Sequence, residues 1–294
     1  MTTTLATPPS PASPPPQLSP GGRTTIRTLL ILAAAVLLVA VVALSATAAW
    51  GVSSFRVVKD SQPLPATLTS VEIDTGSVPV AIRLTSDRES REPRVDMRMV
   101  NSVRAAADPL SVDADGTTAR VTIDAERSEF LQWGRAGEIT LVLPPELARR
   151  LTVTTRQESG VVFAQTDLDQ FTAHTVDGTV VLNGAARRID VTNQHGDITT
   201  RDPISVTQSF RASTTTGDIS VEFAETPGTV DADTQRGDVV VTLPPPGPYF
   251  VDASTGTDSG ATVVRVPQSR DRDAAAAVVT ARTDSGDVVV TDGR

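Results

Sequence analysis

The 294-residue sequence contains no cysteine, only two histidines, and few aromatic residues: seven Phe, two Trp and one Tyr. The absence of cysteine excludes disulfides and thiol chemistry. His174 and His195 have no second His or Cys with which to build a transition-metal site, and no Ser-His-Asp spacing stands out, so we interpret both as polar surface residues. The scarcity of large rings predicts a thin core of Ala, Val, Ile and Thr between closely spaced walls.

Basic residues are also in short supply in most of the chain. From residue 56 onward there are 24 Lys and Arg against 35 Asp and Glu, a net charge of about −11 with neutral histidines. A surface of this sign repels nucleic acid and anionic lipid head groups. We therefore expect no nucleic-acid partner.

One pattern recurs through the second half of the chain, most clearly in 210–223, FRASTTTGDISVEF. Counting from Gly217, an apolar residue lies at −7, a small one at −5, Thr at −3, and apolar residues at +2 and +4. Four more glycines fit the template, and three fit it loosely. The four clear matches are Gly178, Gly196, Gly237 and Gly286, and the looser ones are Gly76, Gly160 and Gly260.

Period two on both sides of a glycine predicts strand, turn, strand. From Gly160 onward the glycines are 18, 18, 21, 20, 23 and 26 residues apart, a period typical of stacked-repeat architectures. One such unit cannot bury its apolar face alone, but a stack of units encloses a continuous core. The sequence therefore predicts an all-β fold, either a β-solenoid or a closely related stack of β-strand repeats.

An aspartate follows the turn glycine in four units, three of which are Gly196-Asp197, Gly217-Asp218 and Gly237-Asp238. Glycine supplies the positive φ of the turn, and aspartate can accept a hydrogen bond from a free backbone N–H. If the units stack in register, Asp197, Asp218 and Asp238 form a column. We expect solvated turn aspartates and no metal, with calcium bridging this column as the alternative.

At this point the chain resembles the "putative adhesin" family of bacterial β-strand-repeat proteins. The resemblance rests on the T-x-x-G-D-[IV]-x-V unit and on the run VTLPPP at 241–246, echoed by LVLPPE at 141–146. It covers about residues 67–291, although 80–138 contain few clean units. The resemblance implies a stacked β fold and adhesion, and it brings no catalytic residue and no cofactor.

Four segments follow from composition. Residues 1–27 contain seven prolines before Gly21 and no acidic residue, which predicts a disordered tail. Residues 28–50 are uncharged and long enough, at roughly 34 Å, to cross a bilayer as one helix. Residues 51–66 then form a tether, and 67–294 the β-repeat domain. A cleaved signal peptide ending near 46–48 is the alternative to a retained helix; the basic leader favours a cytoplasmic amino terminus and an extracytoplasmic β domain.

A candidate catalytic motif occurs at 74–77, Asp-Thr-Gly-Ser, because aspartic proteases hold their carboxylates in turns of this type. Asp258 and Asp284 precede similar Ser-Gly pairs, and two such carboxylates sharing a proton can activate water. The same slot of the repeat also holds Glu, Val, Gln or Thr in other units. We therefore interpret Asp74 as a turn residue and expect no catalytic residue.

Two further motifs have ordinary interpretations. The tripeptide at 236–238, Arg-Gly-Asp, matches an integrin-type motif. Because the residue before the glycine varies freely among units, we interpret the tripeptide as an ordinary part of the repeat. Trp133, in the predicted loop 128–137, is expected to cover the open end of the stack, with a ligand platform as the alternative.

Together these patterns predict a non-enzymatic, membrane-anchored β-repeat domain that binds an envelope protein or polysaccharide. The alternative is a regulatory or scaffold ectodomain in an envelope-stress or transport system, with the proline-rich tail as its cytoplasmic contact. An aspartic-type protease is a third hypothesis.

Overall fold

The computed structural model describes residues 55–102, 109–124, 137–256 and 260–293, together with helical residues 29, 31–34, 36–38 and 40–42. The chain divides into two compact units, 1–54 and 55–294. Among the described residues no helix has both the length and the apolarity needed to cross a membrane. The predicted tail at 1–27 lies outside the described residues and the predicted helix at 28–50 is described only in part, so both stay predictions.

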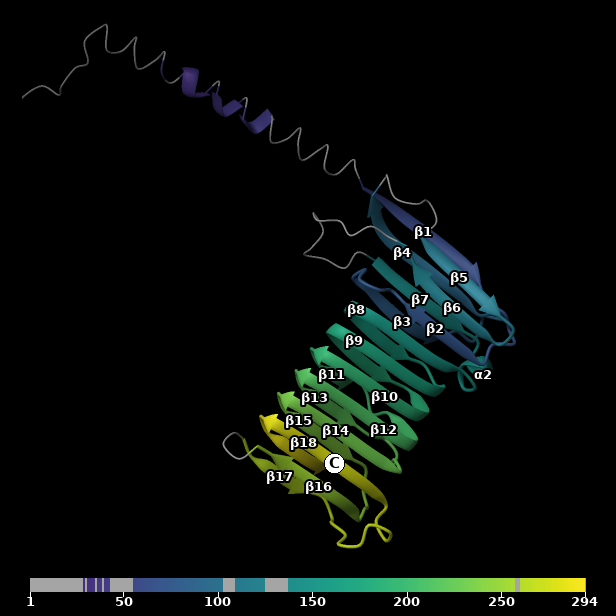
Figure 1. The fold of residues 1–294 in the computed structure, drawn as a ribbon, viewed down its shortest axis with the longest axis vertical. Helices are drawn as coiled ribbons and strands as arrows, with labels where there is room; N and C mark the ends of the chain where they lie inside the picture. The colour runs from purple at the N-terminus through teal and green to yellow at the C-terminus, as the bar shows by residue number, and fades with distance from the viewer. Residues whose placement is uncertain are drawn as a thin grey trace, which may run out of the picture. The chain divides into compact units, whose positions relative to one another are not determined.

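The second unit is all-β, as predicted, and its described strands belong to one open sheet (Figure 1). One short helix, α2 (Pro145–Ala148), lies between β7 and β8. The strands are β1 (Phe55–Pro63), β2 (Ser70–Asp74), β3 (Val80–Ser86), β4 (Arg94–Ser102), β5 (Leu110–Asp115), β6 (Thr118–Ile123), β7 (Gly137–Leu143), β8 (Thr152–Gln165), β9 (Leu168–Asn183), β10 (Ala185–His195), β11 (Ile198–Thr200), β12 (Ser205–Thr216), β13 (Ile219–Glu222), β14 (Thr229–Arg236), β15 (Val239–Leu243), β16 (Tyr249–Thr255), β17 (Thr262–Arg265), β18 (Ala277–Ser285) and β19 (Val288–Asp292).

The repeat template corresponds to a strand, a kink at the glycine and a second strand, which we call a repeat unit. In the unit of Gly217, β12 and β13 pair in parallel with β10 and β11 on one side and with β14 and β15 on the other. Ala212 lies opposite both Val191 and Ala232. Equivalent template positions therefore stack in columns, so these units are in register with one another.

The core lies between the strands that precede the kinks and the strands that follow them. Along β12 alternate residues are buried, including Phe210, Ala212 and Thr214. Phe210 meets Phe223, just beyond β13, edge to face at 5.3 Å between ring centroids. The strand before the kink and the strand after it, which we call the two limbs of a unit, therefore contact each other across the core. This contact explains why both limbs carry apolar residues at alternate positions.

The spatial order of the units departs from chain order at both ends of the stack. The unit of β2 and β3 lies between β8 and the pair β6 and β7. The unit of β18 and β19 likewise lies between the pair β14 and β15 and the pair β16 and β17. Near each end of the stack, one unit is thus inserted between two others that are not its neighbours on both sides in the chain.

The amino-terminal end of the stack is antiparallel. β4 pairs with β7 and β1 pairs with β4, while β5 and β6 form a hairpin around Gly116. Met97 and Met99 on β4 are buried, whereas Arg98 between them is exposed. Residues 55–63, expected to belong to the tether, form β1 instead, because they find a complete antiparallel partner in β4.

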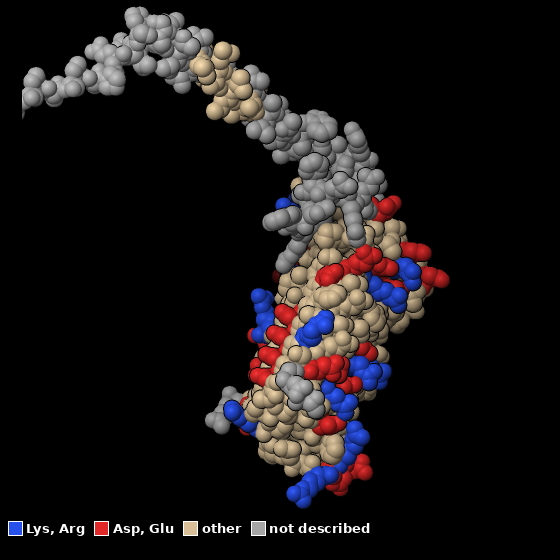
Figure 2. Space-filling view, turned by 60° about the vertical axis from the view of Figure 1, so that its left-hand side comes forward, with Lys and Arg blue, Asp and Glu red and all other residues tan. Residues whose placement is uncertain are grey.

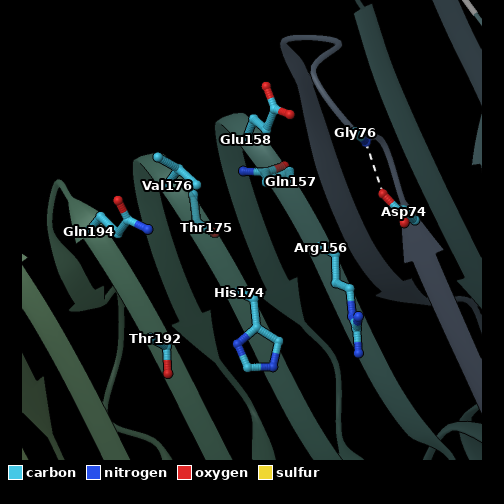
Figure 3. A pocket seen from close by; sticks show the side chains of 10 residues that line it. All are labelled: Asp74, Gly76, Arg156, Gln157, Glu158, His174, Thr175, Val176, Thr192 and Gln194. Atoms are coloured by element: carbon cyan, nitrogen blue, oxygen red, sulfur yellow. Dashed lines mark hydrogen bonds between the residues drawn. The ribbon is translucent and has the colours of Figure 1, made fainter.

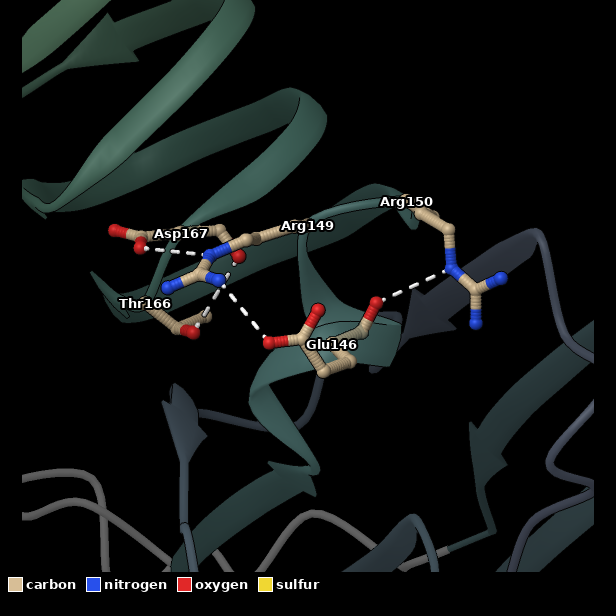
Figure 4. Close-up of polar contacts among 5 residues, drawn as sticks. All are labelled: Glu146, Arg149, Arg150, Thr166 and Asp167. Carbon is tan, nitrogen blue, oxygen red and sulfur yellow. Dashed lines mark hydrogen bonds and ion pairs between the residues drawn. The ribbon is translucent and has the colours of Figure 1, made fainter.

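Helix α2 joins the stack through a small polar cluster (Figure 4). Arg149 pairs with Glu146 at 3.2 Å and with Asp167 at 3.5 Å, and Arg150 Nε donates to the Glu146 carbonyl oxygen at 3.1 Å. Asp167 lies in the connection between β8 and β9. The cluster therefore links α2 to the connection that leads into β9.

The kink glycines form a column in which successive backbones are in close contact. A Cβ built on Gly217 would overlap the carbonyl group of Gly196, the kink glycine of the preceding unit. Gly217 also has φ of +142°, which L side chains rarely adopt. The carbonyl oxygen of Gly217 in turn accepts a hydrogen bond from Thr234 Oγ1 of the next unit at 3.0 Å. The template needs glycine at the kink and a small hydrogen-bond donor at −3 for this reason.

We expect Gly217→Ala to lower the free energy of unfolding by at least about 3 kcal/mol, because the new methyl group forces adjacent units apart. Gly76→Ala is the matched control: Gly76 has φ of +51°, but a Cβ at this position would have no neighbour within 4 Å. Its cost is about 1 kcal/mol, from backbone conformation alone. Chemical denaturation of both variants measures the difference, and equal losses would contradict the close packing of the glycine column.

Candidate functional site

A shallow depression of about 530 Å³ lies on the stack across β8, β9 and β10 (Figure 3). Its lower rim is a row of three exposed side chains, Arg156, His174 and Thr192, which lie side by side in the parallel register. A second row lies two residues further along the same strands. It consists of Glu158, Val176 and Gln194.

Two buried polar residues, Gln157 and Thr175, alternate with these rows along β8 and β9, so their side chains lie on the opposite, inward face of the strands. They are 5% and 4% exposed, and neither the Gln157 amide nor the Thr175 hydroxyl has a hydrogen-bond partner in the part of the chain that the structure describes. At the same template position Thr214 and Thr283 donate to kink carbonyls. A buried polar group without a partner costs about 1–3 kcal/mol. The depression therefore lies over a stretch of the polar column with unused hydrogen-bonding capacity.

Asp74, the candidate catalytic carboxylate, lies at the end of the depression beside β8. Its Oδ1 accepts a hydrogen bond from the backbone N–H of Gly76 at 2.9 Å, which is the local role of a turn aspartate. Its proposed partner Asp284 lies on β18, six strands away in the stack, or roughly 29 Å at the usual strand spacing. Asp258 lies outside the described residues. The structure does not bring Asp74 and Asp284 together as a dyad.

The aspartates that follow the kink glycines form the predicted column. Asp218 N donates to Asp197 Oδ1 at 3.0 Å, and Asp238 N donates to Asp218 Oδ1 at 2.8 Å. Asp287 extends the column in the same way, through its N–H to Asp238 Oδ1 at 2.8 Å. Each carboxylate thus satisfies the first N–H after the next kink. Figure 2 shows acidic side chains following one another along an edge of the stack.

This ladder gives the aspartates a structural task that requires no cation. Within the described ranges no group of three or more His, Asp or Glu side chains is arranged to hold a metal ion. Calcium binding to Asp197, Asp218 and Asp238 stays the alternative hypothesis.

The remaining sequence motifs are separated from one another. His174 lies in the depression, whereas His195 is exposed and lies 3.1 Å from Asp177. The Arg-Gly-Asp tripeptide at 236–238 is part of a repeat unit: its glycine is a kink glycine and Arg236 donates to Thr216 Oγ1 at 3.0 Å. Trp133 lies outside the described residues.

Charged side chains on the outward face are paired between neighbouring units. Arg187 forms a hydrogen-bonded ion pair with Asp169 at 2.8 Å, which lowers the pKa of that carboxyl below its ordinary value. Asp233 has the opposite environment: partial burial, and then repulsion from Asp284 and Asp231, raise its pKa. Ionised Asp233 therefore weakens the folded state.

The depression was not predicted from the sequence. Its rim residues occupy the −4 and −2 positions of three successive units, so the template could have grouped them. The one compositional signal was Gln157, which replaces the usual Thr or Asn at −3.

For the aspartate ladder, we expect Asp218→Ala to destabilise the fold by about 1–2 kcal/mol, because the N–H of Asp238 loses its acceptor. Asp218→Asn keeps an acceptor oxygen and should cost less. The control is Asp113→Ala on exposed β5, expected within about 0.5 kcal/mol of wild type. Urea unfolding in calcium-free buffer compares the three, and an undiminished stability of Asp218→Ala would contradict the ladder.

For Asp233, we expect Asp233→Asn to stabilise the fold at pH 7 by less than about 1 kcal/mol, since exposure screens the repulsion. Folding raises the pKa of Asp233. The side chain therefore costs no stability below the pKa that it has in the unfolded chain, and it destabilises the fold as the pH rises through its pKa in the folded chain. The advantage of the variant should thus vanish below the ordinary pKa of Asp and grow as pH rises above it. Thermal unfolding from pH 3 to pH 7 measures this, and a constant or reversed difference would contradict it.

No family model and no curated protein sequence matches the chain. Similar solved structures include a putative adhesin from Bacteroides fragilis (12% identity, TM-score 0.48, 81% of this chain and 97% of that one). Others are a putative cell adhesion protein from Clostridium sporogenes (10%, 0.35, 81% and 100%) and a putative lipid binding protein from Parabacteroides distasonis (11%, 0.40, 81% and 97%). At these values the likeness is too distant to assign a function, and membership of the adhesin family stays a prediction.

Proposed function

We propose that the chain is a non-enzymatic surface-binding protein whose β-repeat domain, a β-solenoid-like stack of repeat units, binds an envelope protein or polysaccharide on the extracytoplasmic side. The observation that carries the proposal is the parallel in-register pairing of successive units from β8 to β19. Such pairing repeats each outward position at the strand spacing of about 4.8 Å. It makes an extended array suited to a long or repetitive partner.

Two features of the stack favour recognition over catalysis. The inward positions are committed to the core and to the kink glycines, so chemical variety is confined to outward positions. These positions carry paired charges, such as Arg211 with Asp231 at 3.3 Å and Arg282 with Asp252 at 2.6 Å. Paired, half-exposed charges favour specific contacts over strong general attraction.

The charge balance limits the class of partner. A net charge of about −11 after residue 55 disfavours anionic polymers and anionic membranes. Neutral or basic envelope components fit better. The uncharged segment 28–50 would hold the array at the membrane as a single-pass anchor, with the amino terminus in the cytoplasm.

The test is binding of the full-length chain, held in detergent micelles, to cell-envelope fractions by co-sedimentation with and without a calcium chelator. We expect saturable binding. Residues 1–54, which contain the anchor segment without the repeats, are the control and should sediment at least tenfold less.

Equal sedimentation of the two chains would contradict the proposal, because the anchor segment would then account for the association. Absence of saturable binding by the full-length chain would contradict it as well and would favour the scaffold alternative. Loss of binding with chelator would make the aspartate column a metal site.

A further inference from the structure

The carboxy-terminal end of the stack is an open edge. Its last unit consists of β16 and β17, which pair in parallel with β18 and β19 and with no other described strand (Figure 1). Val251 and Ala253 on β16 are only partly buried, whereas their neighbours on β18, Val279 and Ala281, have no exposed surface. The core is therefore incompletely covered at this end.

The backbone groups of β16 also point off this end. The N–H of Tyr249 donates to the Pro267 carbonyl oxygen and its carbonyl oxygen accepts from the N–H of Ser269, both at 2.8 Å, so this segment covers the edge at Tyr249. Because the N–H and C=O groups of alternate residues in a strand point to the same side, those of Val251 and Ala253 also point away from β18. No described strand pairs with them on that side.

β17 has the same arrangement. The carbonyl oxygen of Ala261 accepts a hydrogen bond from the N–H of Val288 of β19 at 2.9 Å. By alternation the backbone groups of Val264 then point away from β19. Val264, like the two inward residues of β16, is partly buried and packs against the core. Both limbs of the end unit thus combine inward apolar side chains with backbone groups directed off the end.

Native sheets usually protect such edges with lysine, proline or other charged residues. At the amino-terminal end of the stack the edge strands carry them: Lys59 and Pro63 lie on β1, and Asp113 and Asp115 lie on β5. β16 and β17 contain no lysine, no proline and one charged residue each. Of the two ends, the carboxy-terminal one is therefore better suited to receive a further strand.

The two charges of the end unit, Asp252 and Arg265, are complementary. Both side chains are exposed; Asp252 contacts Arg282 at 2.6 Å, and Arg265 has no ion pair among the described residues. An antiparallel pairing of β16 with β17 of a second copy can place Asp252 opposite Arg265. The same register places the inward Ala253 opposite the inward Val264, whose backbone groups then face each other. A two-fold axis repeats the pairing with the copies exchanged.

The charge of the whole domain does not oppose this contact. Residues 249–276, which form the end unit and the segment after it, contain four Asp against three Arg. This end is thus close to neutral, and salt screens the more distant charges of the stack.

We infer that the carboxy-terminal end of the stack binds a second copy of the chain, with β16 of each copy paired in antiparallel with β17 of the other. In this dimer the inward apolar side chains of the two end units cover each other, and the ion pair between Asp252 and Arg265 forms twice. The inference goes beyond the proposed function, because it concerns contact between copies. Its tests contain no envelope material, so their outcome is independent of the envelope-binding test.

The first test is sedimentation equilibrium of the full-length chain in density-matched detergent micelles, from about 1 to 100 µM. We expect a monomer–dimer equilibrium. Arg265→Asp should weaken the dimer at least about tenfold, because two attractive pairs become repulsive. The matched control is Arg201→Asp: Arg201 is exposed and occupies the same +5 position in the unit of Gly196, which has neighbours on both sides. Its dimerisation constant should stay within about twofold of wild type.

The inference is overturned if the wild-type chain stays monomeric over this range, or if Arg265→Asp and Arg201→Asp dimerise alike. Growth into assemblies larger than a dimer would overturn it too, because a two-fold contact closes on itself. Thermal unfolding of both variants shows that the comparison is between folded chains.

A cysteine pair tests the register, and the chain contains no cysteine to interfere. The inferred pairing sets Ser254 opposite Val263 of the other copy, in the closely spaced type of antiparallel pair with Cα atoms about 4.5 Å apart, within disulfide range. Ser254→Cys/Val263→Cys should therefore form a covalent dimer on mild oxidation, seen on a non-reducing gel. The control Ser254→Cys/Ser220→Cys should not, because Ser220 occupies the column of Val263 in an interior unit. Absence of the covalent dimer, or equal yields from both chains, would overturn the inference.

Discussion

The contact on which the stack depends is the one between successive kink glycines. The carbonyl group of Gly196 occupies the space that a side chain on Gly217 would need, and its oxygen accepts a hydrogen bond from Thr214 Oγ1 at 3.3 Å. Neither feature suffices alone. Without glycine the backbones could not approach, and without a donor at −3 a buried carbonyl would lack a partner. Together they fix one register between units, since a slip of one residue would place a side chain against the carbonyl.

The other regularities follow from this register. Once the glycines are stacked, the residue after each of them lies directly beside its counterpart, and a carboxylate there can accept the neighbouring N–H, as Asp218 does for Asp238. The small residues at −5, such as Ala212 beside Ala232, leave room for the two limbs to close on each other. The aspartate column is thus a consequence of the kink geometry. Its acidity is compatible with the fold because these aspartates are exposed, so water screens the repulsion between successive carboxylates.

The sequence predicted what is local to a unit and missed what depends on how units are ordered. The strand, kink and strand around Gly217 follow from a short-range pattern. The interchange of units at the two ends does not, because β18 offers the same glycine and the same inward residues as β14, and either could follow its neighbour equally well. The depression was missed for a related reason: its two rows come from three successive units and converge only through parallel pairing.

A fold held by inward columns and a glycine column leaves its outward positions free to vary without loss of the core. Recognition should then be sought at outward positions, because a change there needs no change of the core beneath it. The inward pattern itself varies around Gly160 and Gly178. There Gln157 takes the place of the usual threonine or asparagine, Thr175 leaves its hydroxyl unpaired within the described ranges, and the outward rows carry arginine, histidine and glutamate. Unpaired buried polar groups lower stability unless water satisfies them, so this variation costs stability that the rest of the stack must supply.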